Sequence, residues 1–262
     1  MRIRVIDAFT DEPFRGNPAG VCLLPAGDWP DEAWMQRVAA ELNLSETAFA
    51  KPDATSPVDW ALRWFTPLTE VAMCGHATLA TAHALAEDGR SDGLIRFHTL
   101  SGVLTTEADG DLIAMDFPAS PVSPVDIPEG LAEALGCAVK GAYDTGALGD
   151  LLVELPSAHH VRELRPDPAK LTPYSCRALI VTAAEDDFVS RVFAPSVGIP
   201  EDPVTGSAYT ALGPFWAARI GRTTLTGVQA SARSGRVLVD VRGDRVLLRG
   251  RAITMIDGRL LA

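Results

Sequence analysis

The sequence predicts a mixed α+β protein built from two similar halves, each a curled sheet around one main helix. Strand-like segments with alternating apolar residues outnumber helix-like segments along the chain. One strand–loop–glycine–helix pattern occurs twice, and a proline-rich stretch lies between the two copies. These three observations indicate two lobes of comparable size, each with its own sheet and helix.

Hydrophobic periodicity places the individual elements along the chain. The first half contains two predicted helices, 31–42 and 76–87, and predicted strands at 3–9, 21–24, 47–51, 60–65, 94–99, 102–107 and 112–117. The chain ends in a run of further predicted strands: 228–232, 236–241, 245–249 and 252–256. Strands therefore dominate both halves, with few helices.

The repeated pattern opens with Arg-x-Phe-x-Pro, at residues 63–67 in the first copy and 191–195 in the second. Cys-Gly-His follows at 74–76 and Thr-Gly-Ser at 205–207, and an alanine-rich helical stretch begins at each, over 76–86 and 207–218. The shared order of strand, loop, glycine and helix indicates a duplicated unit. Two unrelated strand–helix turns are the alternative interpretation.

The proline-rich stretch at 117–124 marks the boundary between the copies, because proline cannot continue a helix or a sheet interior. We therefore predict an N-terminal lobe of residues 1–118, with the last C-terminal strand as an optional member, and a C-terminal lobe of residues 119–262.

Composition narrows the classes of function. The net charge of −11 argues against a nucleic-acid partner, whose phosphates need clustered Lys and Arg. No window approaches the roughly 18 apolar residues of a membrane helix, and the N-terminus is strand-like rather than a signal peptide. We therefore expect no membrane contact and a cytoplasmic location. The 4 cysteines are widely spaced without a CxxC pair, which predicts neither disulfides nor a metal site.

Gly75 and Gly206 stand where the helical stretches of the two copies begin. The first amides of a helix lack intrahelical partners and the helix dipole favours negative charge there, while glycine lets a ligand approach closely. Two such helix starts facing each other across a cleft would bind a small carboxylate-bearing metabolite. A role in tight turns alone is the alternative for each glycine.

Four side chains near these glycines are candidates for acid–base chemistry. Glu46 follows Ser45 at the start of a strand, where a buried carboxylate is suited to proton transfer. His76, in the first helical turn, is expected to be neutral, and Ser207 is its counterpart in the second copy. Asp202 precedes Ser207 in the same loop and could orient a neighbouring group. Surface exposure, packing and helix capping are the alternatives for these side chains.

Several of these motifs together resemble the phenazine-biosynthesis PhzF-like isomerase family, which belongs to the wider diaminopimelate-epimerase fold. The residues that carry the resemblance are FRGNPAGV at 14–21, NLSETAF at 43–49, RWFTP at 63–67, CGHAT at 74–78 and EDPVTGS at 201–207. Shorter matches at 98–102 and 115–118 extend it from the first strand through the terminal strands. The order and spacing of the elements make the match specific.

The resemblance implies two pseudo-symmetric diaminopimelate epimerase-like lobes, each a barrel-like sheet around a central helix, with the active site between them. It also implies an isomerisation that uses no cofactor, commonly carried out by a homodimer. In this interpretation Glu46 moves the proton and the other groups assist or bind the substrate. The implied catalytic residues are Glu46, His76, Asp202 and Ser207, and the implied substrate-binding residues are Ser45, Gly75 and Gly206.

One departure from the epimerase branch of this fold bears on the mechanism. Diaminopimelate epimerases and proline racemases typically use two cysteines, one before each of the equivalent glycines. This chain has Cys74 at the first position but Thr205 at the second, and a hydroxyl is too weakly acidic to replace a thiol. The sequence therefore predicts an isomerase that shifts a proton through Glu46. An epimerase or racemase, and a non-catalytic metabolite-binding protein that keeps the fold, are the alternatives.

Overall fold

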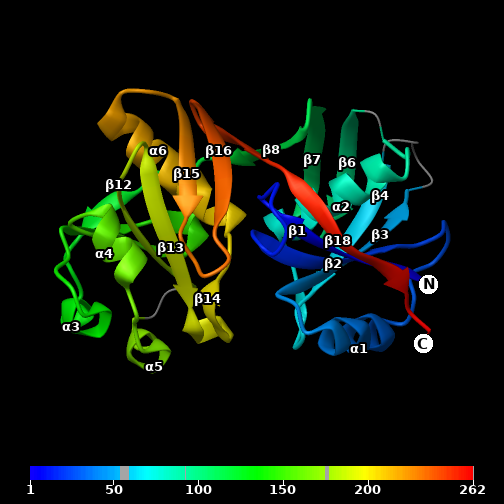
Figure 1. The fold of residues 1–262 in the computed structure, drawn as a ribbon, viewed down its shortest axis with the longest axis horizontal. Helices are drawn as coiled ribbons and strands as arrows, with labels where there is room; N and C mark the ends of the chain where they lie inside the picture. The colour runs from blue at the N-terminus through cyan, green and yellow to red at the C-terminus, as the bar shows by residue number, and fades with distance from the viewer. Residues whose placement is uncertain (54–58, 92, 175–176, 262) are drawn as a thin grey trace. The chain divides into compact units, whose positions relative to one another are not determined.

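The computed structural model describes residues 1–53, 59–91, 93–174 and 177–261. The chain divides into two compact units: unit 1 comprises Met1–Asp116 and Arg249–Ala262, and unit 2 comprises Phe117–Leu248. In Figure 1 the labels β1 to β4, β6, β7, β18, α1 and α2 mark unit 1, and the labels β12 to β16 and α3 to α6 mark unit 2. Each unit mixes strands with a small number of helices, so the predicted α+β class is confirmed.

Unit 1 is a curled sheet whose strands pair mostly in antiparallel fashion. Its strands are β1 (Arg2–Ala8), β2 (Asn17–Leu23), β3 (Glu46–Pro52), β4 (Asp59–Phe65), β5 (Glu70–Val71), β6 (Leu94–Thr99), β7 (Gly102–Asp109), β8 (Leu112–Pro118) and β18 (Ala252–Arg259). Two of the pairings are parallel, between β2 and β3 and between β4 and β6. Parallel neighbours need a crossover connection, and the helices of this unit supply it.

Helix α2 (Gly75–Glu87) is the crossover between β5 and β6 and lies at the centre of unit 1. Its sequence is rich in alanine, so the helix has no wide polar face and is buried along most of its length. It packs against β1, β2, β3 and β18. The other helix, α1 (Glu32–Leu42), buries only one side, with Met35, Val38 and Ala39 facing the sheet.

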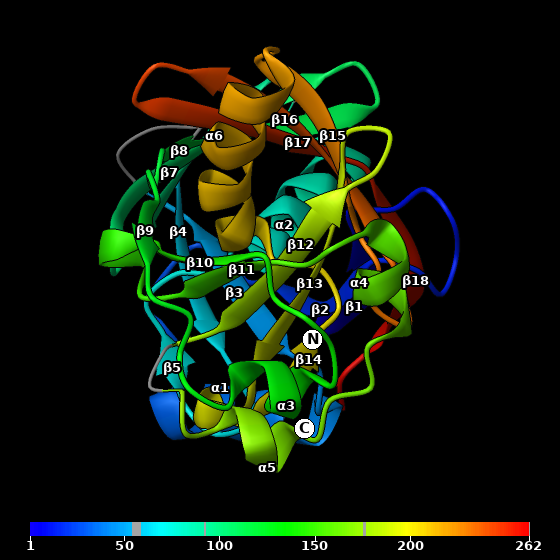
Figure 2. The same cartoon turned by 90° about the vertical axis from the view of Figure 1, so that its left-hand side faces the viewer.

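Unit 2 repeats this plan with additional short helices. Its strands are β9 (Ser123–Val125), β10 (Gly141–Asp144), β11 (Leu151–Glu154), β12 (Leu179–Ala184), β13 (Phe188–Ala194), β14 (Ile199–Asp202), β15 (Thr224–Gln229), β16 (Gly235–Arg242) and β17 (Arg245–Gly250). The helices are α3 (Leu131–Leu135), α4 (Ala158–Glu163), α5 (Pro168–Leu171) and α6 (Tyr209–Ile220). Helix α6 packs against β15 and β16, as the orange helix in Figure 2 shows.

The internal pairings of the two units match strand by strand. In unit 1, β3 pairs antiparallel with β4, which pairs antiparallel with β5 and parallel with β6. In unit 2, β12, β13, β14 and β15 pair in the same order and with the same directions. The central helix lies between β5 and β6 in unit 1 and between β14 and β15 in unit 2. The predicted duplication is therefore visible in the topology.

The duplication extends to two equivalent ion pairs, each made by the arginine that begins the repeated motif. Arg63 on β4 binds Glu70 on β5 through two contacts, of 2.7 Å and 2.6 Å. Arg191 on β13 binds Glu201 on β14 in the same bidentate way, at 2.7 Å and 2.9 Å. The planar guanidinium fits a carboxylate in this geometry. Each arginine thereby fixes the strand that leads into the loop before the central helix.

The last strand of the chain lies in unit 1. The chain enters unit 2 within β8 and returns within β17, and β18 then pairs antiparallel with β1 over its whole length. The short β9 makes the equivalent pairing with β10 in unit 2. The sequence-based division at residue 118 placed 249–262 in the second lobe, with this strand as an optional member of the first. In the structure those residues belong to unit 1.

Several predicted elements differ from the observed ones. Strand β2 begins at Asn17 rather than at residue 21, and β15 spans Thr224–Gln229 rather than 228–232. Helix α6 begins at Tyr209, because Gly206–Ala208 forms a separate 3₁₀ turn, η3. No helix or strand was expected between residues 118 and 190, where β9 to β12 and α3 to α5 lie.

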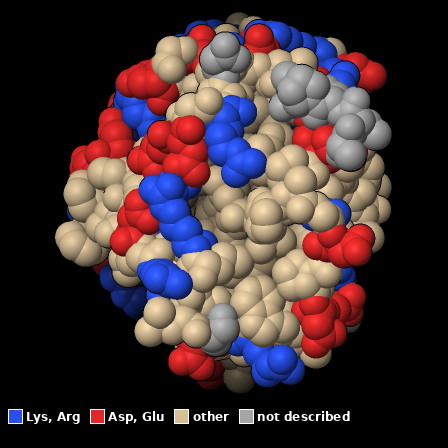
Figure 3. All heavy atoms as spheres, turned by 90° about the vertical axis from the view of Figure 1, so that its right-hand side faces the viewer, with Lys and Arg blue, Asp and Glu red and all other residues tan. Residues whose placement is uncertain are grey.

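No helix among the described residues is long and apolar enough to cross a membrane. Charged side chains on the face drawn in Figure 3 are mixed in sign, with Lys and Arg next to Asp and Glu around an uncharged centre. Cys22, Cys74 and Cys137 form no disulfide with one another, and Cys176 lies outside the described residues.

Candidate active site

A cluster of polar side chains lies where three elements of unit 1 meet. Glu46 begins β3, Asn17 begins β2, and Cys74 and His76 stand at the start of α2. Because β2 and β3 are parallel and adjacent, their first residues lie at the same edge of the sheet. The buried helix α2 starts at this edge, so residues distant in the sequence converge there.

The start of α2 presents unpaired backbone amides beside this group. Cys74 is the N-cap in an extended conformation, and its carbonyl accepts hydrogen bonds from the amide of Thr78 at 3.2 Å and from its hydroxyl at 2.6 Å. The amides of Gly75, His76 and Ala77 have no intrahelical acceptor, as in every α-helix. The helix dipole adds positive potential at this end, which favours a negatively charged ligand.

His76 is almost completely buried, with 5% of its surface exposed. Burial lowers the pKa of its imidazole to about 3, because the charged form is poorly solvated there. The ring is therefore neutral at physiological pH, as the sequence analysis expected. Its Nε2 lies 3.3 Å from Oε2 of Glu46, and its Nδ1 accepts a hydrogen bond from Nδ2 of Asn17 at 3.2 Å.

Glu46 is partly accessible, with 13% of its side chain exposed. A carboxylate in this position is shielded from bulk water but is not sealed from a ligand. Ser45 precedes it, and its hydroxyl donates to Oδ1 of Asn17 at 3.4 Å. Ser45, Glu46, Gly75 and His76, the predicted site residues of the first half, thus lie in one cluster.

Glu46, Cys74 and His76 also form a group that could hold a metal ion, since their ligand atoms lie within 4.8 Å of one another. Nδ1 of His76 is already used in the hydrogen bond with Asn17, and Nε2 faces the Glu46 carboxylate at 3.3 Å without hydrogen-bond geometry. Cys74 Sγ lies 3.5 Å from the same Nδ1 that Asn17 contacts. We therefore interpret this group as a hydrogen-bonded cluster rather than a ligand set.

Unit 2 contains a second polar group around η3. The hydroxyl of Thr205 donates to Asp202 Oδ2 at 2.5 Å, and its amide donates to Oε1 of Gln229 at 2.9 Å. The Gln229 side-chain amide in turn donates to the carbonyl of Asp202 at 2.7 Å. These bonds hold the loop before Gly206. The oxygen of the Thr205 hydroxyl also accepts from Nε2 of Gln229 at 3.3 Å, so the hydroxyl both donates and accepts within this segment.

Ser207 contacts an arginine that the sequence analysis did not select. Arg177 donates from Nη2 to Ser207 Oγ at 3.2 Å and to the buried carboxylate of Asp150 at 2.6 Å. A guanidinium can only donate, so it leaves the serine hydroxyl proton free to point elsewhere. Asp202 ends β14, and Gly206 and Ser207 begin η3, so the predicted residues of the second half lie in one short segment of unit 2, with Arg177 bonded to Ser207.

Replacing Asp150 by asparagine is expected to change how stability depends on pH. Burial raises the pKa of Asp150 to about 6, which outweighs the opposing attraction of Arg177. A raised acidic pKa means that the folded state holds a proton that the unfolded state loses between about pH 4 and pH 6. Its contribution to stability is therefore present below pH 4 and is lost as pH rises through 6. The total change is about 3 kcal/mol.

The measurement is the free energy of urea unfolding of wild type and Asp150→Asn between pH 4 and pH 7. The variant should gain stability relative to wild type across this range. The same substitution at the exposed Asp126 serves as the control. A constant difference between wild type and Asp150→Asn over the whole range would contradict the expectation.

Substitution of Gly227 by alanine is expected to destabilise unit 2 by about 2–3 kcal/mol through overpacking. A Cβ at this position in β15 would lie 2.4 Å from a ring carbon of Tyr209 and 2.5 Å from the ring of Phe188. Tyr209 is the first residue of α6, so the close approach of β15 to its ring fixes where the helix after Ser207 begins. The urea midpoint of Gly227→Ala should fall. Gly93→Ala, at a position with open space around the new methyl group, should leave the midpoint nearly unchanged.

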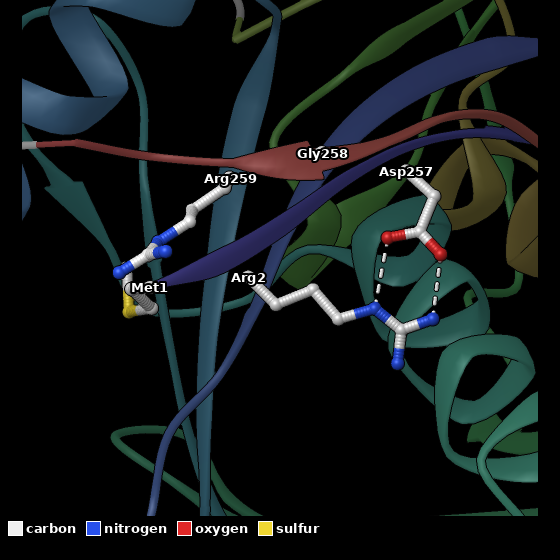
Figure 4. Close-up of a pocket in the computed structure, with 5 residues that line it drawn as sticks. All are labelled: Met1, Arg2, Asp257, Gly258 and Arg259. Atoms are coloured by element: carbon white, nitrogen blue, oxygen red, sulfur yellow. Dashed lines mark hydrogen bonds and ion pairs between the residues drawn. The ribbon is translucent and has the colours of Figure 1, made fainter.

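A surface pocket elsewhere in unit 1 contains none of these residues. It has a volume of about 670 Å³ and is lined by Met1, Arg2, Asp257, Gly258 and Arg259. Figure 4 shows the two contacts between Arg2 and Asp257, of 2.8 Å and 2.5 Å, along its wall. The pocket lies over β1 and β18 and has no acid–base group beside a neutral donor.

Comparison with known proteins places the chain in a family. The sequence pattern of the phenazine biosynthesis-like proteins (PhzC-PhzF) matches residues 6–258. An uncharacterized isomerase of Pseudomonas aeruginosa is 48% identical, with 97% of this chain and 96% of that protein covered. The crystal structure of a PhzF-family protein of Enterococcus faecalis has a TM-score of 0.92 at 39% identity, with 98% and 97% of the two chains covered.

A more distant structure shares the fold alone. The hydroxyproline epimerase of Agrobacterium vitis has a TM-score of 0.64 at 11% identity, with 98% of this chain and 91% of that chain covered. The architecture is therefore that of the PhzF and epimerase class of α+β proteins. Within this class, the chain belongs to the phenazine biosynthesis-like protein family, as its motifs indicated.

Proposed function

We propose that this protein is a cofactor-independent isomerase that moves a proton within a small carboxylate-bearing metabolite. Glu46 is the acid–base group in this proposal. Curated relatives of the chain carry the name isomerase, which supports the reaction class without naming a substrate. Binding of the substrate between the two halves stays a prediction from the sequence.

The observation that carries the proposal is the pairing of Glu46 with a neutral histidine. The Nε2 of His76 lies 3.3 Å from the Glu46 carboxylate, and burial keeps the ring uncharged. An imidazolium at this position would hold the carboxylate in a salt bridge and weaken it as a base. A neutral N–H group can orient the carboxylate and lowers its basicity less than an imidazolium would.

The reaction needs no electron acceptor. The Glu46 carboxylate takes a proton from a substrate carbon, the C–H electron pair spreads into the conjugated system of the substrate, and the same carboxyl group returns the proton at another carbon. The substrate keeps its atoms and its oxidation state. Negative charge that develops on the substrate would be stabilised by the first amides of α2, beginning at Gly75.

The groups of unit 2 support one-base chemistry in the proposal. Thr205 occupies the position equivalent to Cys74, and its hydroxyl donates to Asp202 at 2.5 Å. No thiol stands at that position to act as the second base of a cysteine-based racemase. Ser207 and Gly206 are assigned to substrate binding and orientation.

The test is proton NMR in D2O with a panel of cyclic and amino carboxylates. The panel includes 2,3-dihydro-3-hydroxyanthranilate, diaminopimelate and trans-4-hydroxyproline. We expect enzyme-dependent deuterium incorporation into one substrate class, unaffected by EDTA and lost in Glu46→Gln. Incorporation that persists in Glu46→Gln would exclude this residue as the base. Incorporation with inversion at the α-carbon would instead favour an epimerase.

A further inference from the structure

Asn17 belongs to the FRGNPAGV motif, to which the proposed function assigns no role. It is the first residue of β2 and has no solvent-exposed surface. Gly16 precedes it with φ +67°, and a Cβ on Gly16 would lie 2.2 Å from the carbonyl oxygen of Ala8. Only glycine fits such an approach, so the backbone that enters β2 is held in one place and fixes the position of Asn17.

The side-chain amide of Asn17 bridges Ser45 and His76. Its Oδ1 accepts from the Ser45 hydroxyl at 3.4 Å, and its Nδ2 lies 3.2 Å from Nδ1 of His76. An amide NH2 group can donate but cannot accept, so Nδ1 of His76 must be the acceptor. Cys74 Sγ lies 3.5 Å from the same nitrogen, and a thiol can also donate.

These contacts determine where the ring carries its proton. A neutral imidazole has one N–H, and Nδ1 is used as an acceptor, so the proton is on Nε2. Nε2 is the nitrogen that lies 3.3 Å from Oε2 of Glu46. Hydrogen bonds therefore run from Ser45 through Asn17 to Nδ1 of His76. They leave the protonated Nε2 facing the Glu46 carboxylate at 3.3 Å, a contact that lacks hydrogen-bond geometry in this structure.

We propose that Asn17 is a positioning residue that selects the base of this site by holding the proton of His76 on Nε2. With the proton on Nε2, the ring turns an N–H toward the Glu46 carboxylate, while the unprotonated Nδ1 faces the thiol of Cys74. The other tautomer would place an N–H beside Cys74 Sγ and turn a lone pair toward Glu46. That arrangement favours a protonated Glu46 and a thiolate at Cys74, which is the opposite assignment of acid and base.

The tautomer can be measured without a substrate. Long-range ¹H–¹⁵N spectra of the uniformly ¹⁵N-labelled protein at pH 7 distinguish the protonated ring nitrogen from the unprotonated one, and His76 is assigned by comparison with His76→Gln. We expect wild type to carry the proton on Nε2. In Asn17→Asp a carboxylate acceptor replaces the donor, so the proton should move to Nδ1. Asn43→Asp, at the exposed C-cap of α1, makes the same change outside the site and should leave His76 unchanged.

A second variant covers the case in which a buried aspartate prevents folding. Asn17→Leu removes the donor without adding charge, and both tautomers of His76 should then be populated. A proton on Nδ1 in wild type, or an unchanged Nε2 tautomer in a folded Asn17→Asp or Asn17→Leu, would overturn the proposal. Circular dichroism establishes that each variant is folded.

The catalytic consequence rests on the proposed function and has a separate readout. Once deuterium exchange identifies a substrate, Asn17→Leu should lower kcat roughly 10- to 100-fold with little change in KM. The reason is that the variant misorients the base but leaves the groups that bind the substrate in place. A tautomer that shifts while kcat is unchanged would uphold the positioning of His76 but overturn Glu46 as the base. An unchanged tautomer would overturn the role of Asn17 and leave the Glu46 assignment intact.

Discussion

Glu46→Gln should reduce the rate of solvent-deuterium incorporation by roughly 10³-fold, within the range that a general base contributes. Glutamine has the same shape as glutamate and presents an oxygen to Nε2 of His76, so the packing around β3 should persist. The amide cannot take a proton from carbon. The loss should therefore appear in kcat with a smaller effect on KM, because the carboxylate acts only when the proton moves.

Two further variants separate this chemistry from a general loss of negative charge. Glu41→Gln removes the same charge from the exposed face of α1 and should keep full activity. Glu46→Asp keeps the carboxylate but withdraws it by about one methylene, which should cost roughly 10²-fold. Equal rates for Glu46→Gln and wild type on an identified substrate would falsify the assignment of Glu46.

The duplication was predictable from the sequence because it repeats local signals. Arg-x-Phe-x-Pro followed by a glycine and an alanine-rich stretch combines strand, loop and helix cues at short range. The glutamates that pair with the two arginines were not predictable from those cues. Glu70 and Glu201 lie on the short strands β5 and β14, whose sequences differ, and only the antiparallel return of these strands brings each glutamate opposite its arginine.

The elements that the sequence analysis missed are short or depend on distant pairing. Strand β9 has only three residues, two of which flank a proline, and it exists because β10 pairs with it. The assignment of β18 to unit 1 depends in the same way on β1, at the opposite end of the chain. Helices α3 and α5 are too short for a helical period to be evident.

Within the candidate site, the sequence predicted the residues that stand in a recognisable local pattern. It did not predict the residues that hold them in place through contacts from other elements. His76 and Ser207 follow glycines at helix starts, which is a pattern that one segment displays. Asn17 and Arg177 act through contacts between elements far apart in the chain. Asn17 lies in the FRGNPAGV motif, but that motif indicated the family and not a contact with His76. The Gly16-Asn17 dipeptide could have indicated a tight backbone approach, but it also occurs in ordinary turns.

The neutral His76 also makes unit 1 sensitive to acid. Its pKa is about 3 in the folded protein, because burial penalises the charged ring, and about 6.5 when the chain is unfolded. Between these values the unfolded chain binds a proton that the folded protein does not. The contribution of His76 to stability is therefore present above pH 6.5 and is lost as pH falls toward 3.

His76→Gln removes this titration, so the stability of wild type relative to the variant should fall by about 3 kcal/mol between pH 7 and pH 4. Hydrogen exchange of the α2 amides measures this loss in unit 1 separately from the opening of unit 2. Glu46 is the acidic group that faces the ring, so the comparison is repeated in the Glu46→Gln background, where a slope caused by His76 alone should persist. The exposed His159→Gln in α4 should show no such slope. A pH-independent difference between wild type and His76→Gln would mean that the ring is solvated, and the neutral donor beside Glu46 would then lose its physical basis.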